Sequence, residues 1–131
     1  MLFRSSKRLF PLTDLLAAAD IGIVIAPSPQ TTPLKWSSIL DDVNSIVDAF
    51  PVSDRGAHFA VSTVGNVSKM ALSFNTLRGS DYNVDEVKSK ISQIPYEKVD
   101  TTRLDLGLEQ AADEMFTEEN GMRKEASKVP A

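Results

Sequence analysis

The pattern of apolar residues in the first part of the chain predicts a strand followed by a helix. Residues 21–26, Ile-Gly-Ile-Val-Ile-Ala, form an apolar run without polar alternation, which is typical of a strand covered on both faces of a parallel sheet. From Thr32 onward, apolar residues recur every three or four positions, and Pro33 suits the first turn of a helix. This pattern predicts one amphipathic helix of about four turns. Its apolar positions are Leu34, Trp36, Ile39, Leu40, Val43, Ile46, Val47 and Phe50.

Two further strands are predicted after a turn at residues 51–56. Residues 57–64 are mostly apolar, and Gly65-Asn66 is typical of a tight hairpin turn. In residues 67–74, Met70, Leu72 and Phe74 alternate with smaller or more polar side chains. This alternation predicts an antiparallel strand with one exposed face.

The second half of the chain predicts two helices. In the first, Val84, Val87, Ile91 and Ile94 share one face, and Pro95 ends the helix. The second begins at Thr102 or a neighbour and ends at Asn120-Gly121, and its predicted apolar side consists of Leu104, Leu108, Ala111, Met115 and Phe116. The order strand, helix, strand, strand, helix, helix predicts a doubly wound, Rossmann-like α/β fold with helices on both faces of the sheet.

Composition narrows the class of protein. At 131 residues with 42% hydrophobic and 24% charged residues, the chain fits one soluble globular domain. The net charge is −4, and the residues after the first nineteen carry about −6, which disfavours a nucleic-acid partner. There is no cysteine, so disulfides, thiolate metal sites and cysteine nucleophiles are excluded. No segment approaches the roughly 20 apolar residues of a membrane span.

Residues 1–19 differ from the rest of the chain. Three basic residues precede an apolar segment that ends in Ala17-Ala18-Ala19, a pattern similar to a signal peptide with a small-residue cleavage site. Pro11 and Asp14 interrupt that segment, and a disordered leader is the alternative interpretation. We therefore divide the chain into a leader or degenerate signal-like segment, residues 1–19, and one domain, residues 20–131.

Candidate chemistry is sparse. The loop Ala26-Pro-Ser-Pro-Gln30 follows the first predicted strand, where α/β sheets usually bind ligands, yet it has no acid, no base and no glycine-rich phosphate cradle. His58 is the only histidine and belongs to no recognisable constellation of nucleophile or metal-ligand residues, so we assign it to packing. Asn66-Val-Ser68 is an N-glycosylation sequon on a predicted turn. We expect no enzyme, and a nucleotide-binding enzyme domain is disfavoured because the first loop lacks its glycines.

Five segments occur in an order that matches one known family. They are Asp20–Ile25, Trp36–Phe50, Arg55–Val61, Ile94–Tyr96 together with Thr102–Leu108, and Phe116–Arg123 together with Lys128-Val129. Together they resemble a von Willebrand factor type A (vWA) domain of the kind found in collagen VI and matrilins. The resemblance implies a secreted, extracellular adhesion or protein-binding module, with collagen or another matrix component as its partner.

The resemblance also implies a place for a metal ion. In this family an Asp-x-Ser-x-Ser motif after the first strand, a threonine from a second loop and an aspartate after the fourth strand hold a divalent cation, the metal-ion-dependent adhesion site (MIDAS). Here the motif positions are Ala26, Ser28 and Gln30, and Thr102 matches the threonine. Two neutral hydroxyls, Ser28 and Thr102, cannot repay the dehydration of Mg²⁺. We therefore expect a degenerate site without a metal cofactor, and Asp100 is the one acid near the second loop that could add an oxygen.

The last aspartate of the family motif falls beyond Ala131, so the resemblance implies that the C-terminal part of the domain is absent. The first strand would then have an unpaired apolar edge, and such edges recruit other strands. We expect a partial domain, whether a fragment, a splice form or a decayed copy, with self-association through this edge. A structural or assembly element without a ligand of its own is therefore the alternative function.

Overall fold

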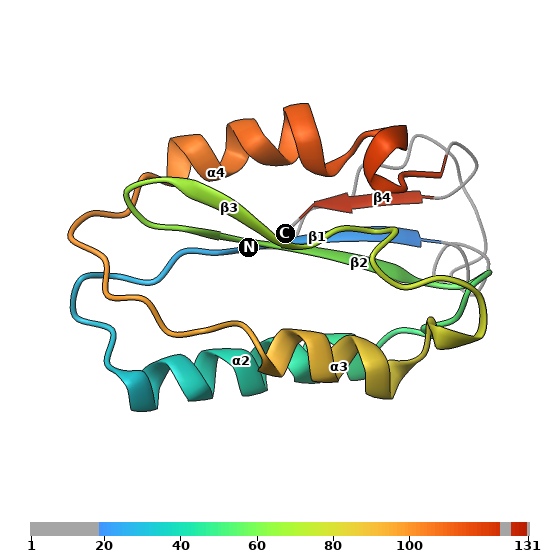
Figure 1. The fold of residues 1–131 in the computed structure, drawn as a ribbon, viewed down its shortest axis with the longest axis horizontal. Helices are drawn as coiled ribbons and strands as arrows, with labels where there is room; N and C mark the ends of the chain where they lie inside the picture. Colours follow the sequence, from blue (N-terminus) through green and yellow to red (C-terminus); the bar gives the residue numbers. More distant parts are fainter. Residues whose placement is uncertain (1–18, 124–126, 131) are drawn as a thin grey trace.

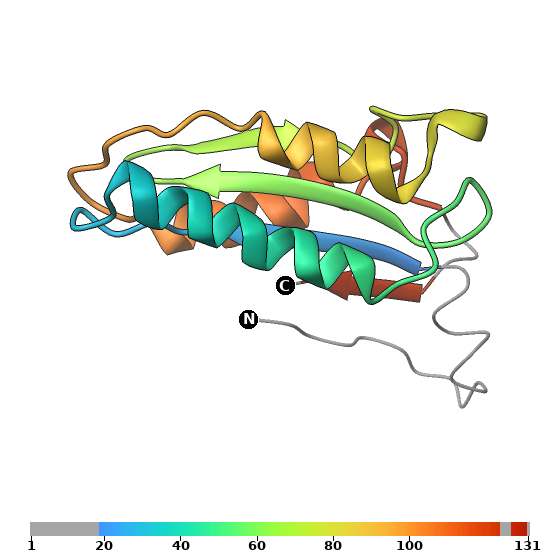
Figure 2. The same ribbon diagram turned by 90° about the horizontal axis from the view of Figure 1, so that it is seen from below.

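A computed structural model of the chain, which describes residues 19–123 and 127–130, has three layers (Figures 1 and 2). A sheet of strand order β3-β2-β1-β4 forms the middle layer. Helices α2 (Pro33–Asp48) and α3 (Val84–Ser92) cover one face, and α4 (Leu104–Gln110) covers the other. The strands are β1 (Ala19–Ile25), β2 (His58–Val64), β3 (Ser68–Leu72) and β4 (Ser127–Pro130). The predicted α/β fold with helices on both faces is confirmed.

Strand β1 lies inside the sheet and pairs with two parallel neighbours. Asp20 lies opposite His58 on β2, and the pairing continues to Ile25 opposite Thr63. Ala19, which the sequence analysis placed in the leader, is the first residue of β1 and is fully buried. The other residues of the predicted leader, 1–18, lie outside the described part of the chain.

The edge of β1 is partly covered by β4. Ala19–Gly22 pair in parallel with Ser127–Pro130. The expectation of a wholly unpaired β1 edge is therefore wrong, because four residues near the end of the chain already form a strand there. Within the described residues, β4 covers only the first part of the seven-residue strand β1.

The alternation predicted for residues 67–74 fails at a β-bulge. Leu72 pairs with Val61 and Met70 pairs with Ser62, so Ala71 has no residue opposite it. Leu72 consequently joins the main core, which the sheet forms with α2 and α3, whereas Met70 packs on the opposite face, in the smaller core beneath α4. The three residues predicted to share one face, Met70, Leu72 and Phe74, are thus divided between the two cores.

Helix α2 begins where the sequence predicts. The Thr32 hydroxyl accepts a hydrogen bond from the Lys35 backbone N–H at 3.2 Å, and Pro33 is the first helical residue. Its buried side chains are Trp36, Leu40, Val43 and Val47. Leu34, predicted on the apolar side, is 79% exposed and is therefore not part of the core.

The last predicted helix is divided into three pieces. After α4 the chain forms one π-helical turn, η2 (Ala111–Met115), and a 3₁₀ turn, η3 (Glu118–Asn120), which Gly121 ends with a φ of 94°. Its predicted apolar side is only partly correct: Ala111 and Met115 are buried, but Leu104 and Leu108 are each 46% exposed.

Gly107 explains this rotation of α4. A Cβ atom at Gly107 would lie 3.0 Å from Val24 Cγ1 and 3.2 Å from Val64 Cγ1. The helix can therefore approach the sheet closely only with its glycine face inward, which turns Leu104 and Leu108 to the side.

A buried ion pair lies at the end of the sheet where β1 begins. Asp20 is fully buried, and its Oδ1 lies 2.9 Å from Arg123 Nε, while its Oδ2 accepts the Arg123 backbone N–H at 2.7 Å. Arg123 Nη2 also donates to the carbonyls of Ala19, at 3.0 Å, and Gly56, at 2.7 Å. One side chain thus joins β1, the turn before β2 and the segment that follows η3.

His58 lies beside this ion pair. Its ring stacks on Tyr82 with centroids 3.8 Å apart, and Nε2 donates to the Asp54 carbonyl at 2.7 Å. Burial, and then the positive charge of Arg123, lowers the pKa of His58 below its ordinary value. The sequence-based assignment of His58 to packing agrees with this buried, stacked position.

We expect Asp20→Asn to lower the free energy of unfolding by about 3 to 5 kcal/mol, because it leaves the charge of Arg123 without its buried partner. Urea unfolding followed by the fluorescence of Trp36, the only tryptophan, measures this. The matched control is Asp48→Asn, which breaks an exposed pair with Lys88 and should cost less than about 1 kcal/mol. Equal losses in the two variants would contradict a dominant role for the buried pair.

The lowered pKa of His58 predicts a pH dependence of stability. Between its folded pKa and the unfolded value near 6.5, the unfolded state binds more protons, so the stability contributed by neutral His58 is complete above about pH 6.5 and is lost as the pH falls. The free energy of unfolding should therefore fall more between about pH 7 and pH 5 in the wild type than in His58→Gln. Equal slopes in urea titrations of the two proteins would show that His58 has no such effect.

Candidate functional site

Three loops meet at the carboxyl ends of β1 and β2, the edge where ligands usually bind in an open α/β sheet. They are the first loop (residues 26–32), the hairpin turn (residues 65–67) and the connector (residues 93–103) between α3 and α4 (Figure 1). The first loop and the hairpin turn directly follow the parallel strands β1 and β2. These loops are therefore the place to look for the predicted site.

Two side chains of the connector hold it to the first loop. The Tyr96 hydroxyl donates to the Thr31 carbonyl at 2.9 Å, and the Thr102 hydroxyl donates to the Pro27 carbonyl. Both contacts join residues that are more than sixty positions apart in the sequence. Two hydrogen bonds from separate residues of the connector thus hold the first loop in place.

The connector is also joined to the hairpin turn. The Thr101 backbone N–H donates to Asn66 Oδ1 at 3.1 Å, and the Arg103 backbone N–H donates to the Gly65 carbonyl at 2.8 Å. Val99 packs so closely over Gly65 that a Cβ atom at Gly65 would overlap its side chain. Glycine is required here by close approach rather than by its backbone angles.

The two hydroxyls predicted as remnants of a metal site lie near the same stretch of backbone. Thr102 is half-buried, and its hydroxyl contacts Pro27, the residue before Ser28. Ser28 is exposed; its Oγ accepts the Gln30 backbone N–H at 3.3 Å and lies 3.4 Å from Thr31 Oγ1. Each hydroxyl therefore takes part in holding a loop in place.

The side chains at these positions do not suit the divalent cation that the family resemblance implies. Mg²⁺ is held in proteins by oxygen ligands that usually include carboxylates, and the first loop carries none. The Thr102 hydroxyl donates to Pro27 and keeps its lone pairs, but it is a neutral ligand, and Asp100 lies exposed on the connector. Across residues 19–123 and 127–130, no three His, Cys, Asp or Glu side chains form a group that could hold a metal ion.

The predicted glycosylation site lies on the hairpin turn. Asn66 is exposed, while its Oδ1 accepts the hydrogen bond from Thr101. The hydroxyl of Ser68, the third residue of the sequon, donates to Gln110 Oε1 on α4 at 2.5 Å. Asn66 thus has a structural contact in addition to its predicted role.

Sequence reasoning missed the residues that join the loops. Tyr96 belongs to a segment that resembles the family, but nothing in its spacing points to Thr31, 65 residues earlier. Asn66 was assigned only as a sequon and a turn residue. Such contacts between distant loops leave no periodic pattern in a single sequence.

The family profile described as von Willebrand factor type A domain matches residues 20–130. The chain belongs to this family. The vWA domain mediates protein–protein interactions and is generally an interaction module rather than an enzyme. Among the helices described by the structure, none is both long and apolar enough to cross a membrane.

Solved structures share this vWA fold. Proximal thread matrix protein 1 from the mussel byssus, in its crystal form 2, has a TM-score of 0.76 and 20% identity over 86% of this chain and 29% of its own. The same mussel protein with a zinc-occupied MIDAS motif has a TM-score of 0.69 and 22% identity over 86% of this chain and 27% of its own. An uncharacterized membrane spanning protein from Vibrio fischeri has a TM-score of 0.51 and 13% identity, with 79% and 52% coverage.

The likeness to these structures concerns the fold alone, because all three are under 25% identical to this chain. The chain spans less than a third of the length of the mussel protein. No curated protein matches the sequence.

Proposed function

We propose that this vWA chain is a non-catalytic extracellular adhesion module that binds a protein partner without a metal ion. In this proposal Ser28 and Thr102 are remnants of a degenerate MIDAS, and they hold loops instead of coordinating a cation. The partner is collagen or another matrix component. Residues 1–18 act as a leader and Asn66 carries a glycan, both in keeping with secretion.

The lack of a carboxylate in the first loop is the observation that carries this proposal, since a hydroxyl that donates a hydrogen bond can still bind a cation through its oxygen. The Thr102 hydroxyl joins the connector to the first loop through the Pro27 carbonyl. Ala26 and Gln30, at the other two motif positions of the first loop, offer no carboxylate. A partner would therefore contact a preformed surface of three joined loops, with no ion between it and the domain.

Support for a matrix partner comes from the comparisons. The family is one of protein–protein interaction modules, and the mussel protein of similar fold is named as a thread matrix protein. The net charge of −4 disfavours a polyanionic partner such as nucleic acid. Collagen and other matrix proteins are the partner class that agrees with these observations.

We expect the chain to bind immobilised collagen equally well in magnesium and in excess EDTA, because no cation takes part in recognition. A solid-phase binding assay with collagen as the probe measures this. Loss of binding in EDTA would contradict a metal-independent module, and absence of binding in both buffers would contradict collagen as the partner.

The double variant Ala26→Asp with Gln30→Ser is the control for metal binding, because it restores the first-loop motif. In calorimetric titrations with Mg²⁺, the wild type should give no stoichiometric binding below about millimolar concentration. The double variant should bind more tightly than the wild type. Stoichiometric binding of Mg²⁺ by the wild type in this range would overturn the assignment of a degenerate site.

A structural or assembly element is the second candidate function, and one observation favours it. In the described part of the chain, β4 pairs with Ala19–Gly22 and leaves the remainder of β1 paired only with β2. Leu104 and Leu108, on the α4 turn that contacts Val24, are each 46% exposed. A partly uncovered strand edge and two exposed leucines on α4 both favour association with a second copy of the chain.

The assembly function predicts a mass above the monomer value of 14.3 kDa in sedimentation equilibrium. Leu104→Lys combined with Leu108→Lys should lower that mass, because charge on this side of α4 opposes apolar association. Leu34→Lys, at an exposed leucine of α2, is the matched control and should leave the mass unchanged. A monomeric wild type at all concentrations would rule out self-association.

A further inference from the structure

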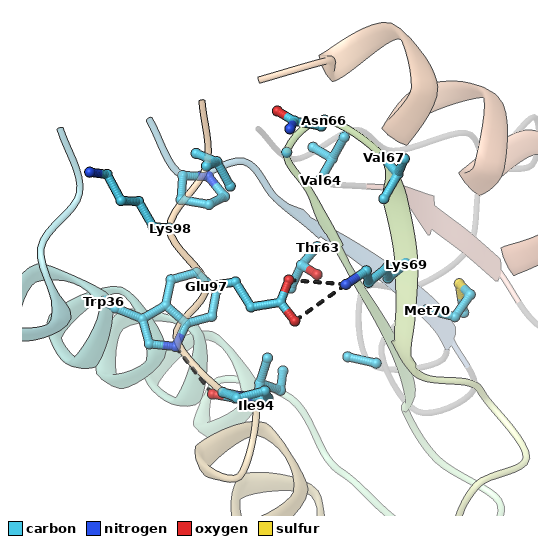
Figure 3. Close-up of a pocket in the computed structure, with 15 residues that line it drawn as sticks. Trp36, Thr63, Val64, Asn66, Val67, Lys69, Met70, Ile94, Glu97 and Lys98 are labelled. Carbon is cyan, nitrogen blue, oxygen red and sulfur yellow. Dashed lines mark hydrogen bonds and ion pairs between the residues drawn. The ribbon is translucent and has the colours of Figure 1, made fainter. Parts of the chain in front are cut away.

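A pocket of about 340 Å³ lies between the connector and strands β2 and β3 (Figure 3). Its size is at the lower end of the range for small-molecule sites in proteins. Pro27 contributes to it, but neither Ser28 nor Thr102 lines it. The pocket is therefore distinct from the position of the family's metal site.

The inner walls of the pocket are apolar and held in place. Trp36 and Ile94 are 5% and 9% exposed, and Trp36 Nε1 donates to the Ile94 carbonyl at 3.1 Å. That bond satisfies the only polar atom of the indole, so the rest of the ring presents carbon to the cavity. Val99, on the connector, packs against Gly65 and completes the apolar lining.

The connector needs no rearrangement to form these walls. Its hydrogen bonds from Tyr96 to Thr31 and from Thr101 to Asn66 hold the lining segment in its middle and just beyond Val99. A cavity that exists before a ligand arrives costs less ordering entropy on binding than one that must form.

The rim of the pocket is polar and carries an exposed ion pair. Lys69 Nζ lies 3.0 Å from Glu97 Oε2 across the opening, and the two side chains are 56% and 57% exposed (Figure 3). Lys98 also lines the pocket, but its ammonium points away from Lys69 and Glu97, so the charges at the opening are those of this one ion pair (Figure 3). An ion pair this exposed is weak, and a ligand anion can share or replace Glu97 at Lys69.

We propose that this pocket binds a small organic anion with a flat apolar body, of the aromatic carboxylate or sulfonate class. The ring system lies against Trp36 and Val99, and the anionic group pairs with Lys69 at the rim. Charge complementarity selects the anion, and the apolar walls select the ring. The pocket opens within the surface of the three joined loops, but binding of the small anion does not require the proposed protein partner.

The test uses 8-anilinonaphthalene-1-sulfonate as the anionic probe and N-phenyl-1-naphthylamine as its uncharged analogue. We expect saturable, one-to-one binding of the sulfonate by the folded chain, with quenching of Trp36 fluorescence. The uncharged analogue should bind about tenfold more weakly, because it loses the contact with Lys69.

Variants locate the binding site. Lys69→Glu should weaken binding of the sulfonate about tenfold or more, because it reverses the charge at the rim. Binding of the uncharged analogue should be nearly unchanged. Arg78→Glu makes the same change of charge on an exposed loop away from the pocket and should have no effect. Ala71→Trp places a large side chain at a residue that lines the pocket and should weaken both probes.

Amide chemical shifts of the wild type provide a readout that does not depend on any variant folding. Addition of the sulfonate should move the signals of Thr63, Lys69 and Val99 and leave those of the α4 turn at Gly107 unchanged. Binding that is equal for the two probes and insensitive to Lys69→Glu would overturn the anion preference. Shifts confined to residues outside the pocket, or no saturable binding, would overturn the site itself.

Discussion

The carboxylate of Asp20 is completely buried, and this one charge constrains how the rest of the chain is arranged. A buried carboxylate is tolerated only when it is paired and hydrogen-bonded, and Arg123 supplies both a guanidinium and a backbone N–H. Because Arg123 also donates to Gly56, the pair holds together β1, the approach to β2 and the segment that leads toward β4. The strand that carries the first loop is therefore fixed at its far end.

At the opposite end of the sheet, a second set of contacts fixes the loops themselves. The connector between α3 and α4 reaches the first loop through Tyr96 and Thr102, and the hairpin turn through Thr101 and Val99. The same segment forms one wall of the pocket beside Trp36. Ser28 and Thr102, which we propose to be remnants of a metal site, take part in hydrogen bonds that hold these loops.

Several features of the fold and the site follow from local patterns in the sequence. The apolar run before Ala26 predicts a central strand, and the Thr32-Pro33 pair predicts where α2 begins. The replacement of motif residues by Ala26 and Gln30 is visible in the sequence alone. Where the prediction fails, a long-range contact is responsible. The bulge at Ala71 depends on pairing with β2. The exposure of Leu104 and Leu108 depends on how closely Gly107 approaches Val24 and Val64.

The sequence by itself determined the order of the first three strands and of the helices between and after them, the resemblance to the vWA family and the absence of a carboxylate from the first loop, because these depend on periodicity and on which residue types are present. The tertiary structure decided that Asp20 pairs with Arg123, that β4 covers part of β1, and that Thr102 contacts Pro27. It also decided that the connector and β3 enclose a pocket with Lys69 and Glu97 at its rim. Each of these contacts joins residues far apart in the chain, and their partners are chosen by the packing of the whole domain rather than by local sequence.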